Sequence, residues 1–588
     1  MAKKLLTNYF KLHNIKQFRE SITEPANNAY YVFAAKHTPY TGGDTAVPDI
    51  TDSIQESFYN PYKYMVFGKR VTESDLRVMV KRNRWTENFV YTPYRSNTSL
   101  ANASFFVCVE KSDGAHIFKC LDNAGGARST AEPNRNDVTA NTEYYSTSDG
   151  YIWKWMYSLD TSTFRKFSTD LYIPVVPNSD ISGNAVAGAI EVVTISSGGS
   201  DYNTFLANTF LASDLRIGGN PRYYALAENA SSESEYYKDS FLYLTNGTGR
   251  GQGRKITRFF ISGSNKVAEI ESEFTIAPDS TTQYEVTPFV SITGDGTGAT
   301  ARALVNTSSS NTIYKIEIIT RGSSYTYASA QITGYQGGGS NTATVAPVLG
   351  PKGGHGSDPE NELFGSVLGI SVDFDKSESG AIPTNNNYRV VGLIKDPLFA
   401  NVQINFPSTV STFDIGETVT QQNGATGKVV TFNAISPAYL RLTNVNGQFV
   451  SGQTVTGSTT NANGVVSSVQ VNGGNASFAT FDQRAKLTVS SKAGSFAEDE
   501  SVYQVASSVA NGYVHEYDSL NSFVYLTDVR GTINSGERII GDTGSANVDT
   551  FTPPDIVEGS GEVLIIENQD PIDRSNSQIE TIKFILQF

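Results

Sequence analysis

The sequence predicts a mainly β, multidomain protein made of antiparallel sheets and sandwiches, with a few short N-terminal helices and two inserted β regions. The chain has 588 residues, which is enough for about three or four domains. Hydrophobic residues make up 39% and charged residues 18%, a mixture too apolar for a disordered chain. The 51 glycines, 31 tyrosines and 32 phenylalanines are typical of strands joined by tight turns.

The N-terminal part, residues 1–176, combines two predicted helices with several predicted strands. Apolar residues recur at helical spacing over residues 8–21, which predicts an amphipathic helix, and residues 49–59 are predicted to form a second short helix. The apolar residues of the first helix are Leu12, Ile15, Phe18 and Ile22. Apolar and aromatic runs predict strands at residues 62–67, 105–110, 116–121 and 151–159.

The last of these runs carries a row of aromatic residues, namely Tyr151, Trp153, Trp155 and Tyr157. Because side chains alternate along a strand, all four are expected on one face of a sheet. A packed sheet face is the favoured interpretation, and a stacking platform for bases or sugars is the alternative.

Residues 177–362 form a region rich in Gly, Ser, Thr and Asn, with short β runs. The tripeptide Ile-Thr-Gly occurs at 292–294 and again at 332–334, 40 residues later. Weak internal similarity of this kind suggests stacked or duplicated β units.

A stronger repeat lies within residues 399–555. Leu442, Val445, Gly447, Gly452 and Gly457 recur 84 residues later as Leu526, Val529, Gly531, Gly536 and Gly541. Phe413, Glu417 and Val419 recur as Phe496, Glu500 and Val502, with a shift of 83 residues. Residues 401–466 and 484–551 are therefore predicted to be two copies of one small β module. The retained glycines follow strand runs, so they are expected at turns that need a positive φ.

Residues 556–588 end in an alternating pattern that predicts a terminal strand. Ile582, Phe584, Leu586 and Phe588 alternate with Thr581, Lys583, Ile585 and Gln587. A strand with one apolar face is expected to dock into a sheet.

Charge and composition argue against several classes of protein. The net charge of −14 argues against a general surface for nucleic acid or anionic membrane. The N-terminus lacks the apolar region of a secretion signal, and no run of about 18 apolar residues occurs, so the chain is expected to be made in the cytoplasm. A virus particle assembled there fits equally well. Cys108 and Cys120 are too few for a disulfide scaffold and are expected to be core thiols.

No residue is predicted to be catalytic, to bind a cofactor or to hold a metal. The 5 histidines show no metal-ligand spacing with one another or with cysteine, and no Gly-x-Ser-x-Gly elbow occurs. The glycine-rich segment 247–255 lacks the Gly-Lys-Ser/Thr ending of a phosphate loop and precedes a strand-like run. It is therefore predicted to be a tight hairpin turn.

Two polar clusters are also expected to be structural. His355, Asp358, Glu360 and Glu362 are interpreted as a polar junction loop, with carboxylate acid–base chemistry as the alternative. The acidic run 498–500 is interpreted as a solvated turn, with calcium binding as the alternative.

Five short segments follow one another in the order found in a known protein family. They are Met65 to Tyr91 (M-x-x-G-K-x-V, then R-x-x-W), Lys119 to Asp122, Asp149 to Lys154 (D-G-Y-I-W-K), Tyr388 to Pro397, and Gly561 to Phe588. Together they resemble the dimeric baseplate wedge subunit of T-even-like contractile-tailed bacteriophages. The resemblance covers about residues 1–176, 363–398 and 556–588. Residues 177–362 and the repeat at 399–555 depart from the family pattern, the latter as an insertion.

The resemblance implies a mostly β homodimer in the virion, within the tail baseplate. It implies that the chain connects neighbouring wedge proteins during tail assembly and rearranges with the baseplate on adsorption, without catalysis, nucleic acid or membrane. Residues 1–176, 363–398 and a C-terminal hairpin at 556–588 would form the wedge body. The alternative is a receptor-binding tail protein that recognises host glycan through the inserted β modules. A glycan-cutting tail enzyme is a third hypothesis.

Overall fold

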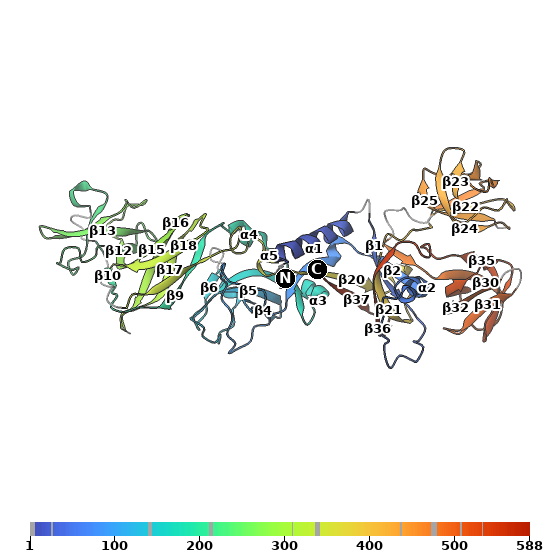
Figure 1. The fold of residues 1–588 in the computed structure, drawn as a ribbon, viewed down its shortest axis with the longest axis horizontal. Helices are drawn as coiled ribbons and strands as arrows, with labels where there is room; N and C mark the ends of the chain where they lie inside the picture. The colour runs from blue at the N-terminus through green and yellow to red at the C-terminus, as the bar shows by residue number, and fades with distance from the viewer. Residues whose placement is uncertain are drawn as a thin grey trace, which may run out of the picture. The chain divides into compact units, whose positions relative to one another are not determined.

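A computed structural model describes residues 6–588 apart from 25–27, 139–143, 208, 211–215, 309, 335–340, 401, 436–437, 472–478, 506–508 and 532. Strands make up 47% and helices 10%, in several antiparallel sheets and a small barrel, which confirms the predicted fold class (Figure 1). The chain divides into two compact units. Unit 1 comprises Met1–Leu12 and Val78–Val367, and unit 2 comprises His13–Arg77 and Leu368–Phe588. These units and the predicted domains divide the chain at different places, and the predicted domain boundaries stay predictions.

Both N-terminal helices form close to their predicted positions. Helix α1 spans Asn8–Thr23, with Ile15 and Ile22 buried. The second helix begins later than predicted, as a π-helical turn η1 (Gln55–Tyr59) that continues into α2 (Asn60–Tyr64). Pro61 is near the start of α2, directly after the π-helical turn.

The N-terminal sheet of unit 1 shows that the four aromatic residues of the strand at 151–159 do not share one face, contrary to the prediction. It has the order β4 (Phe106–Lys111), β5 (Gly114–Asn123), β7 (Tyr151–Asp160) and β6 (Tyr144–Ser146). Ile117 lies opposite Tyr157 but Phe118 lies opposite Trp155, so Met156 is an extra residue in a β-bulge. Because an extra residue reverses the alternation, Tyr157 packs with Ile117 on one face. Tyr151, Trp153 and Trp155 pack on the other face, and all four rings are buried, which leaves no exposed stacking platform.

The rest of unit 1 is built largely from residues 177–362. Its nine-stranded sheet has the order β11 (Tyr223–Ala225), β14 (Asn265–Ile270), β13 (Gly253–Ser262), β12 (Ser240–Asn246), β15 (Gln283–Gly294), β16 (Thr297–Asn306) and β17 (Thr312–Ser323), and β10 (Phe205–Ala207) and β18 (Ala328–Thr333) also pair with β15. Further strands pair as β9 (Ile190–Ser197) with β19 (Thr344–Leu349), and β3 (Leu76–Lys81) with β8 (Tyr172–Pro174). The short helices are α3 (Thr161–Phe167), α4 (Ser179–Asn184) and α5 (Pro359–Glu362).

Two predictions for this region have clear outcomes. Residues 247–252 connect β12 to β13, which confirms the hairpin turn, and Gly247, Gly249 and Gly251 have φ of 75°, 80° and 89°. The first Ile-Thr-Gly tripeptide ends β15, and the Ile-Thr of the second ends β18, which pairs directly with β15, with Val290 opposite Ile332.

The main sheet of unit 2 brings together strands from distant parts of the sequence. Its order is β29 (Thr480–Asp482), β2 (Met65–Arg70), β1 (Tyr30–Ala35), β21 (Asn387–Lys395) and β36 (Glu562–Asp573). The last strand, β37 (Ile579–Gln587), pairs with β20 (Val367–Asp375). Phe584 is buried and the ring of Phe588 lies 5.8 Å from that of Phe18, which confirms the docked terminal strand.

The two repeated segments fold as two separate β structures within unit 2. The first is a seven-stranded sheet in the order β27 (Asn463–Val465), β26 (Thr454–Gly457), β23 (Thr418–Gln421), β24 (Thr426–Asn433), β25 (Tyr439–Asn446), β22 (Val402–Asn405) and β28 (Ser468–Val471). The second is a closed barrel in the order β30 (Ala485–Gly494), β33 (Phe523–Arg530), β32 (Val509–Asp518), β31 (Ser501–Val505), β34 (Arg538–Ile540) and β35 (Gly544–Thr552).

Equivalent side chains make equivalent hydrogen bonds in the two repeats. The Gln421 amide donates to the carbonyl of Val450 at 2.7 Å and accepts from its N–H at 2.8 Å. Gln504 does the same with Asn534, at 2.9 Å and 2.7 Å. The shared sequence pattern thus gives both copies the same pair of hydrogen bonds between a glutamine side chain and the backbone.

The retained glycines serve two different purposes. Gly447, Gly452, Gly531 and Gly536 have φ between 78° and 87°, as predicted. The prediction is wrong for Gly457 and Gly541, whose φ is not positive. A Cβ atom at Gly457 would lie 2.5 Å from the carboxylate of Glu417, and one at Gly541 would lie 2.6 Å from that of Glu500. These two glycines make room for a carboxylate that binds backbone N–H groups of the adjoining turn.

Candidate interaction sites

The residues that the sequence singled out as potentially reactive are held in the interior or in turns. Cys108 and Cys120 are free and buried, and burial raises the pKa of the Cys108 thiol to about 12, as expected of core thiols. Within the described ranges, no group of three or more His, Cys, Asp or Glu side chains is placed to hold a metal ion. None of the helices described is long and apolar enough to cross a membrane.

The predicted junction loop at residues 355–362 is instead a buried ion-pair site in unit 1. Glu362, at the end of α5, pairs with Lys119 of β5, and the two side chains are 1% and 0% exposed. The carboxylate also accepts the N–H groups of Gly356 at 2.8 Å and Asp358 at 3.1 Å. Burial lowers the pKa of Lys119, and the charge of Glu362 opposes that effect.

A second buried pair lies beside the first. Lys154 of β7 stands directly opposite Lys119 in the sheet, so two like charges are neighbours. The Lys154 ammonium is 3.4 Å from Glu191 of β9, and Glu191 also binds Arg321 of β17 at 3.2 Å. Two buried carboxylates therefore balance the two buried lysines, and the network connects the inserted region 177–362 to the N-terminal sheet.

His355 lies against this network and is neutral. Its ring is buried and stands edge-on to the ring of Tyr94 at 4.9 Å. Neither ring nitrogen has a hydrogen-bond partner among the residues described. Burial, together with the positive charges of Lys119 and Lys154, lowers the pKa of His355 well below its usual value.

A histidine pair joins the barrel of the second repeat to the main sheet of unit 2. His515 of β32 accepts a hydrogen bond from Arg484 at 3.3 Å through Nδ1, so its Nε2–H faces the Tyr388 hydroxyl at 3.2 Å. The ring of His37 lies 4.9 Å away. His37 is held between the carboxylate of Asp499 and the hydroxyl of Thr527, each at 2.6 Å.

Charges around this joint keep His515 neutral. Arg484 is paired with Asp482 and Glu516, each at 2.8 Å. Burial and the positive charge of Arg484 lower the pKa of His515 well below its usual value. The acidic run 498–500 is a turn with Glu498 and Asp499 exposed, as predicted, although Asp499 also binds His37 and Glu500 accepts the N–H of Thr543.

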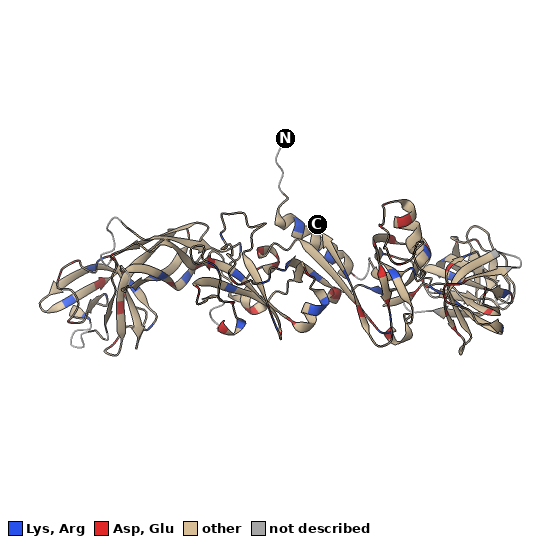
Figure 2. Cartoon of the chain, turned by 90° about the horizontal axis from the view of Figure 1, so that it is seen from below, with Lys and Arg blue, Asp and Glu red and all other residues tan. Residues whose placement is uncertain are grey.

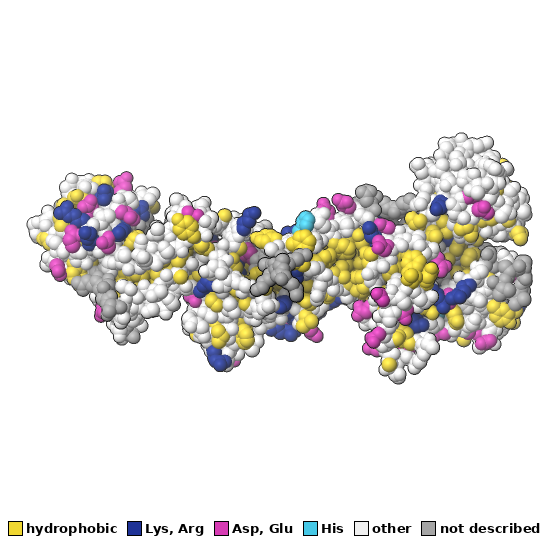
Figure 3. Space-filling view, viewed as in Figure 1, with side chains coloured by type: hydrophobic (Ala, Val, Ile, Leu, Met, Phe, Trp, Pro, Cys, Tyr) yellow, Lys and Arg dark blue, Asp and Glu magenta, His cyan; other side chains and the backbone are white. Residues whose placement is uncertain are grey.

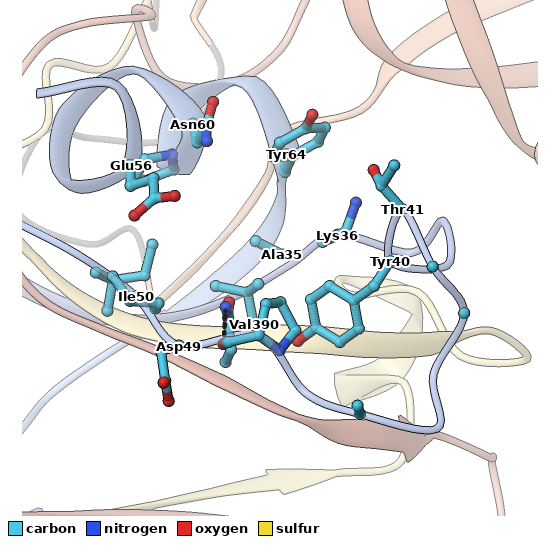
Figure 4. Close-up of a pocket in the computed structure, with 17 residues that line it drawn as sticks. Ala35, Lys36, Tyr40, Thr41, Asp49, Ile50, Glu56, Asn60, Tyr64 and Val390 are labelled. Carbon is cyan, nitrogen blue, oxygen red and sulfur yellow. Dashed lines mark hydrogen bonds between the residues drawn. The ribbon is translucent and has the colours of Figure 1, made fainter. Parts of the chain in front are cut away.

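A pocket of about 440 Å³ opens in unit 2 between the end of β1, the following loop and α2 (Figure 4). Ala35, Ile50, Pro61, Val390 and Ile566 contribute apolar walls. The Lys36 ammonium lies 4.6 Å from the centre of the Tyr64 ring and 5.7 Å from that of Tyr40. Burial, followed by repulsion from Arg389 and Lys63, lowers the pKa of Lys36.

The surface carries exposed apolar side chains together with charges of both signs. Residues of both signs are interspersed over both units (Figure 2). Apolar side chains are exposed around β1 and α2 (Figure 3). Near the pocket, Ile54 is 69% and Tyr59 is 57% exposed.

The sequence pointed to Glu362, His355 and the acidic run 498–500, but not to their partners in the ion-pair network and the histidine joint, and it gave no sign of the pocket. Their members come from segments far apart in the chain, such as Lys119 and Glu362, which are 243 residues apart. In the sequence, a buried lysine looks like any polar residue of an alternating strand. Its burial therefore cannot be predicted from its neighbours in the chain.

Comparisons with known proteins found no related family and one weak structural likeness. A scan against protein-family models matched no family, and a search of curated proteins found no match. Among solved structures, the chain shows a likeness to one described as "Virion of native gene transfer agent (GTA) particle". The identity is 10% and the TM-score 0.14, and the match covers 44% of this chain and 78% of the other. A TM-score this low carries no argument about fold or function.

Proposed function

We propose that this chain is a structural subunit of a phage tail baseplate wedge, which connects neighbouring wedge proteins during tail assembly and baseplate rearrangement. The observation that carries the proposal is the pairing of the family-like segments with one another. Segments around Met65, Tyr388 and Gly561 supply β2, β21 and β36, which join β1 in one sheet. Gly392 lies opposite both Phe33 and Ile566 in that sheet. Three of the five family-like segments, hundreds of residues apart in the chain, thus pair in one sheet of unit 2, which supports the proposal, and the other two lie in unit 1.

In this proposal, the segments that depart from the family pattern add surface through which the subunit can contact other molecules. Residues 402–471 and 485–552 form a sheet and a barrel with cores of their own. Modules that close on themselves can be inserted at surface loops without rebuilding the body. Buried ion-pair networks keep such a subunit rigid, while smaller polar interfaces with a second copy and with other wedge proteins can exchange partners.

A second role, recognition of host glycan, is favoured by one difference between the repeats. Tyr503 and Tyr513 lie on neighbouring barrel strands and are 44% and 39% exposed. The first repeat has Thr420 and Lys428 at the equivalent positions. Exposed aromatic rings provide stacking surfaces for sugars.

Labelling of the virion tests the structural role. We expect a gold-binding tag inserted after Leu520, whose side chain is 94% exposed, to appear on the baseplate in negative-stain images of purified particles. The same tag on an unrelated host protein controls for adventitious gold. Particles without label, from cells that make the tagged chain, would contradict the proposal.

A further inference from the structure

The pocket beside Lys36 has the features of a ligand site. Its volume of about 440 Å³ lies within the range of small-molecule pockets. Its walls combine apolar and polar residues, and the Lys36 ammonium enters between two tyrosine rings (Figure 4). A pocket with apolar walls and a few convergent polar groups is the usual form of a binding site.

The backbone holds Lys36 in an unfavourable conformation at this place. Its φ is 56°, in the left-handed region that residues with a side chain seldom adopt. The conformation is fixed by the Lys36 N–H, which donates to the carbonyl of Tyr64 at 2.8 Å. This bond ties the end of β1 to α2 and directs the lysine between the rings of Tyr64 and Tyr40.

Most carboxylates near the pocket are engaged elsewhere, and that of Asp49, which also lines the pocket, points away from Lys36 (Figure 4). Asp44 binds Arg389 through two hydrogen bonds of 2.7 Å. Asp499 binds His37 at 2.6 Å, and Glu56 accepts both the N–H and the hydroxyl of Thr51. Within the part of the chain that the structure describes, Lys36 has no ion-pair partner. Its ammonium is therefore a positive charge that a bound anion could pair with.

We propose that this pocket binds a carboxylate attached to an apolar group, with the carboxylate on the Lys36 ammonium and the apolar group against Ile50, Val390 and Ile566. A singly charged anion fits better than phosphate, because the carboxylates of Asp49 and Glu56, which line the pocket, would repel a doubly charged ligand more strongly. The same chemistry is offered by a free organic acid and by the C-terminus of a partner polypeptide ending in an apolar residue. The inference goes beyond the proposed structural role and does not depend on it.

Calorimetric titration of the full chain tests the site with N-acetyl-L-phenylalanine and its C-terminal amide as probes. The two probes share the ring and differ in the negative charge. Because a hydrogen bond to a charged group contributes about 1.5–3 kcal/mol, the acid is expected to bind about 10- to 100-fold more tightly than the amide. Lys36→Met should abolish that preference and Lys36→Arg should retain it.

Controls separate the site from general effects of charge and folding. Lys315→Met removes an exposed lysine of unit 1 and should leave the preference unchanged. Equal affinity for acid and amide, binding of neither, or a preference that survives in a folded Lys36→Met variant would overturn the proposal. A peptide Gly-Ser-Gly-Ser-Gly-Phe with a free C-terminus distinguishes the sources. Binding as tight as that of the free acid supports a polypeptide terminus, and binding of the free acid alone supports a small organic acid.

Discussion

Replacing Glu362 by alanine is expected to destabilise unit 1 by about 3–5 kcal/mol, because the Lys119 ammonium would be left buried without its anion. The Lys119 side chain is 0% exposed, so water cannot solvate the charge without opening the core. Two backbone N–H groups, those of Gly356 and Asp358, would lose their acceptor as well. Lys119 would respond by losing its proton, which limits the cost but does not remove it.

Amide hydrogen exchange read by mass spectrometry measures this effect region by region, which suits a chain with several cores. Peptides from β5 and α5 should exchange faster in Glu362→Ala. Glu132→Ala is the matched control, because Glu132 pairs with Lys111 at the surface and an exposed pair contributes less than about 1 kcal/mol. The double variant Lys119→Met, Glu362→Gln should recover most of the loss. Protection unchanged in the single variant would show that the pair does not hold the unit together.

Acidification from about pH 7.5 to about 5.5 is expected to loosen the barrel of the second repeat from the sheet it contacts. The pKa of His515 is lowered in the folded state, so the unfolded or undocked form binds the proton more readily. Docking is therefore fully stable above the usual histidine pKa of about 6.5 and weakens as the pH falls below it. A proton on Nδ1 would also point at Arg484, which now donates to that atom.

Hydrogen exchange of β32 peptides, corrected for the intrinsic effect of pH, checks this expectation. His515→Gln keeps one acceptor for Arg484 and one donor toward Tyr388 but does not titrate, so it should exchange equally at both pH values. His355 has a lowered pKa too, and its titration should affect peptides of unit 1 instead. Acid sensitivity of β32 that persists in His515→Gln would refute the role given to His515.

Local patterns in the sequence predict local structure well here, and the failures have specific causes. Alternation predicts the terminal strand, and the missing Lys-Ser/Thr ending predicts a hairpin turn at 247–252, because both depend on neighbouring residues. The sheet face of Tyr157 is predicted wrongly, because the bulge beside it depends on the register with β5, which is a different segment of the chain. The spacing of Gly457 and Gly541 marks the repeat correctly, but the carboxylate that needs the space is visible only in three dimensions.

The candidate sites could not be predicted for a related reason. Lys36 is one of 45 basic residues, and nothing in its sequence neighbourhood shows that nearby acids are already paired. The buried lysines Lys119 and Lys154 occupy regular positions in strands, where exposed lysine is common. Only the packed structure shows which charged side chains are exposed to solvent, which form ion pairs and which have no ion-pair partner among the described residues.

Deletion of the gene from the virus, followed by negative-stain imaging of the lysate, tests the central claim most directly. A baseplate wedge subunit is required before the tail can be built, so free heads and no complete tails are expected, with assembly restored by the gene supplied in trans. Complete virions that fail to attach to the host would contradict the wedge proposal and would favour the glycan-binding role of the inserted modules.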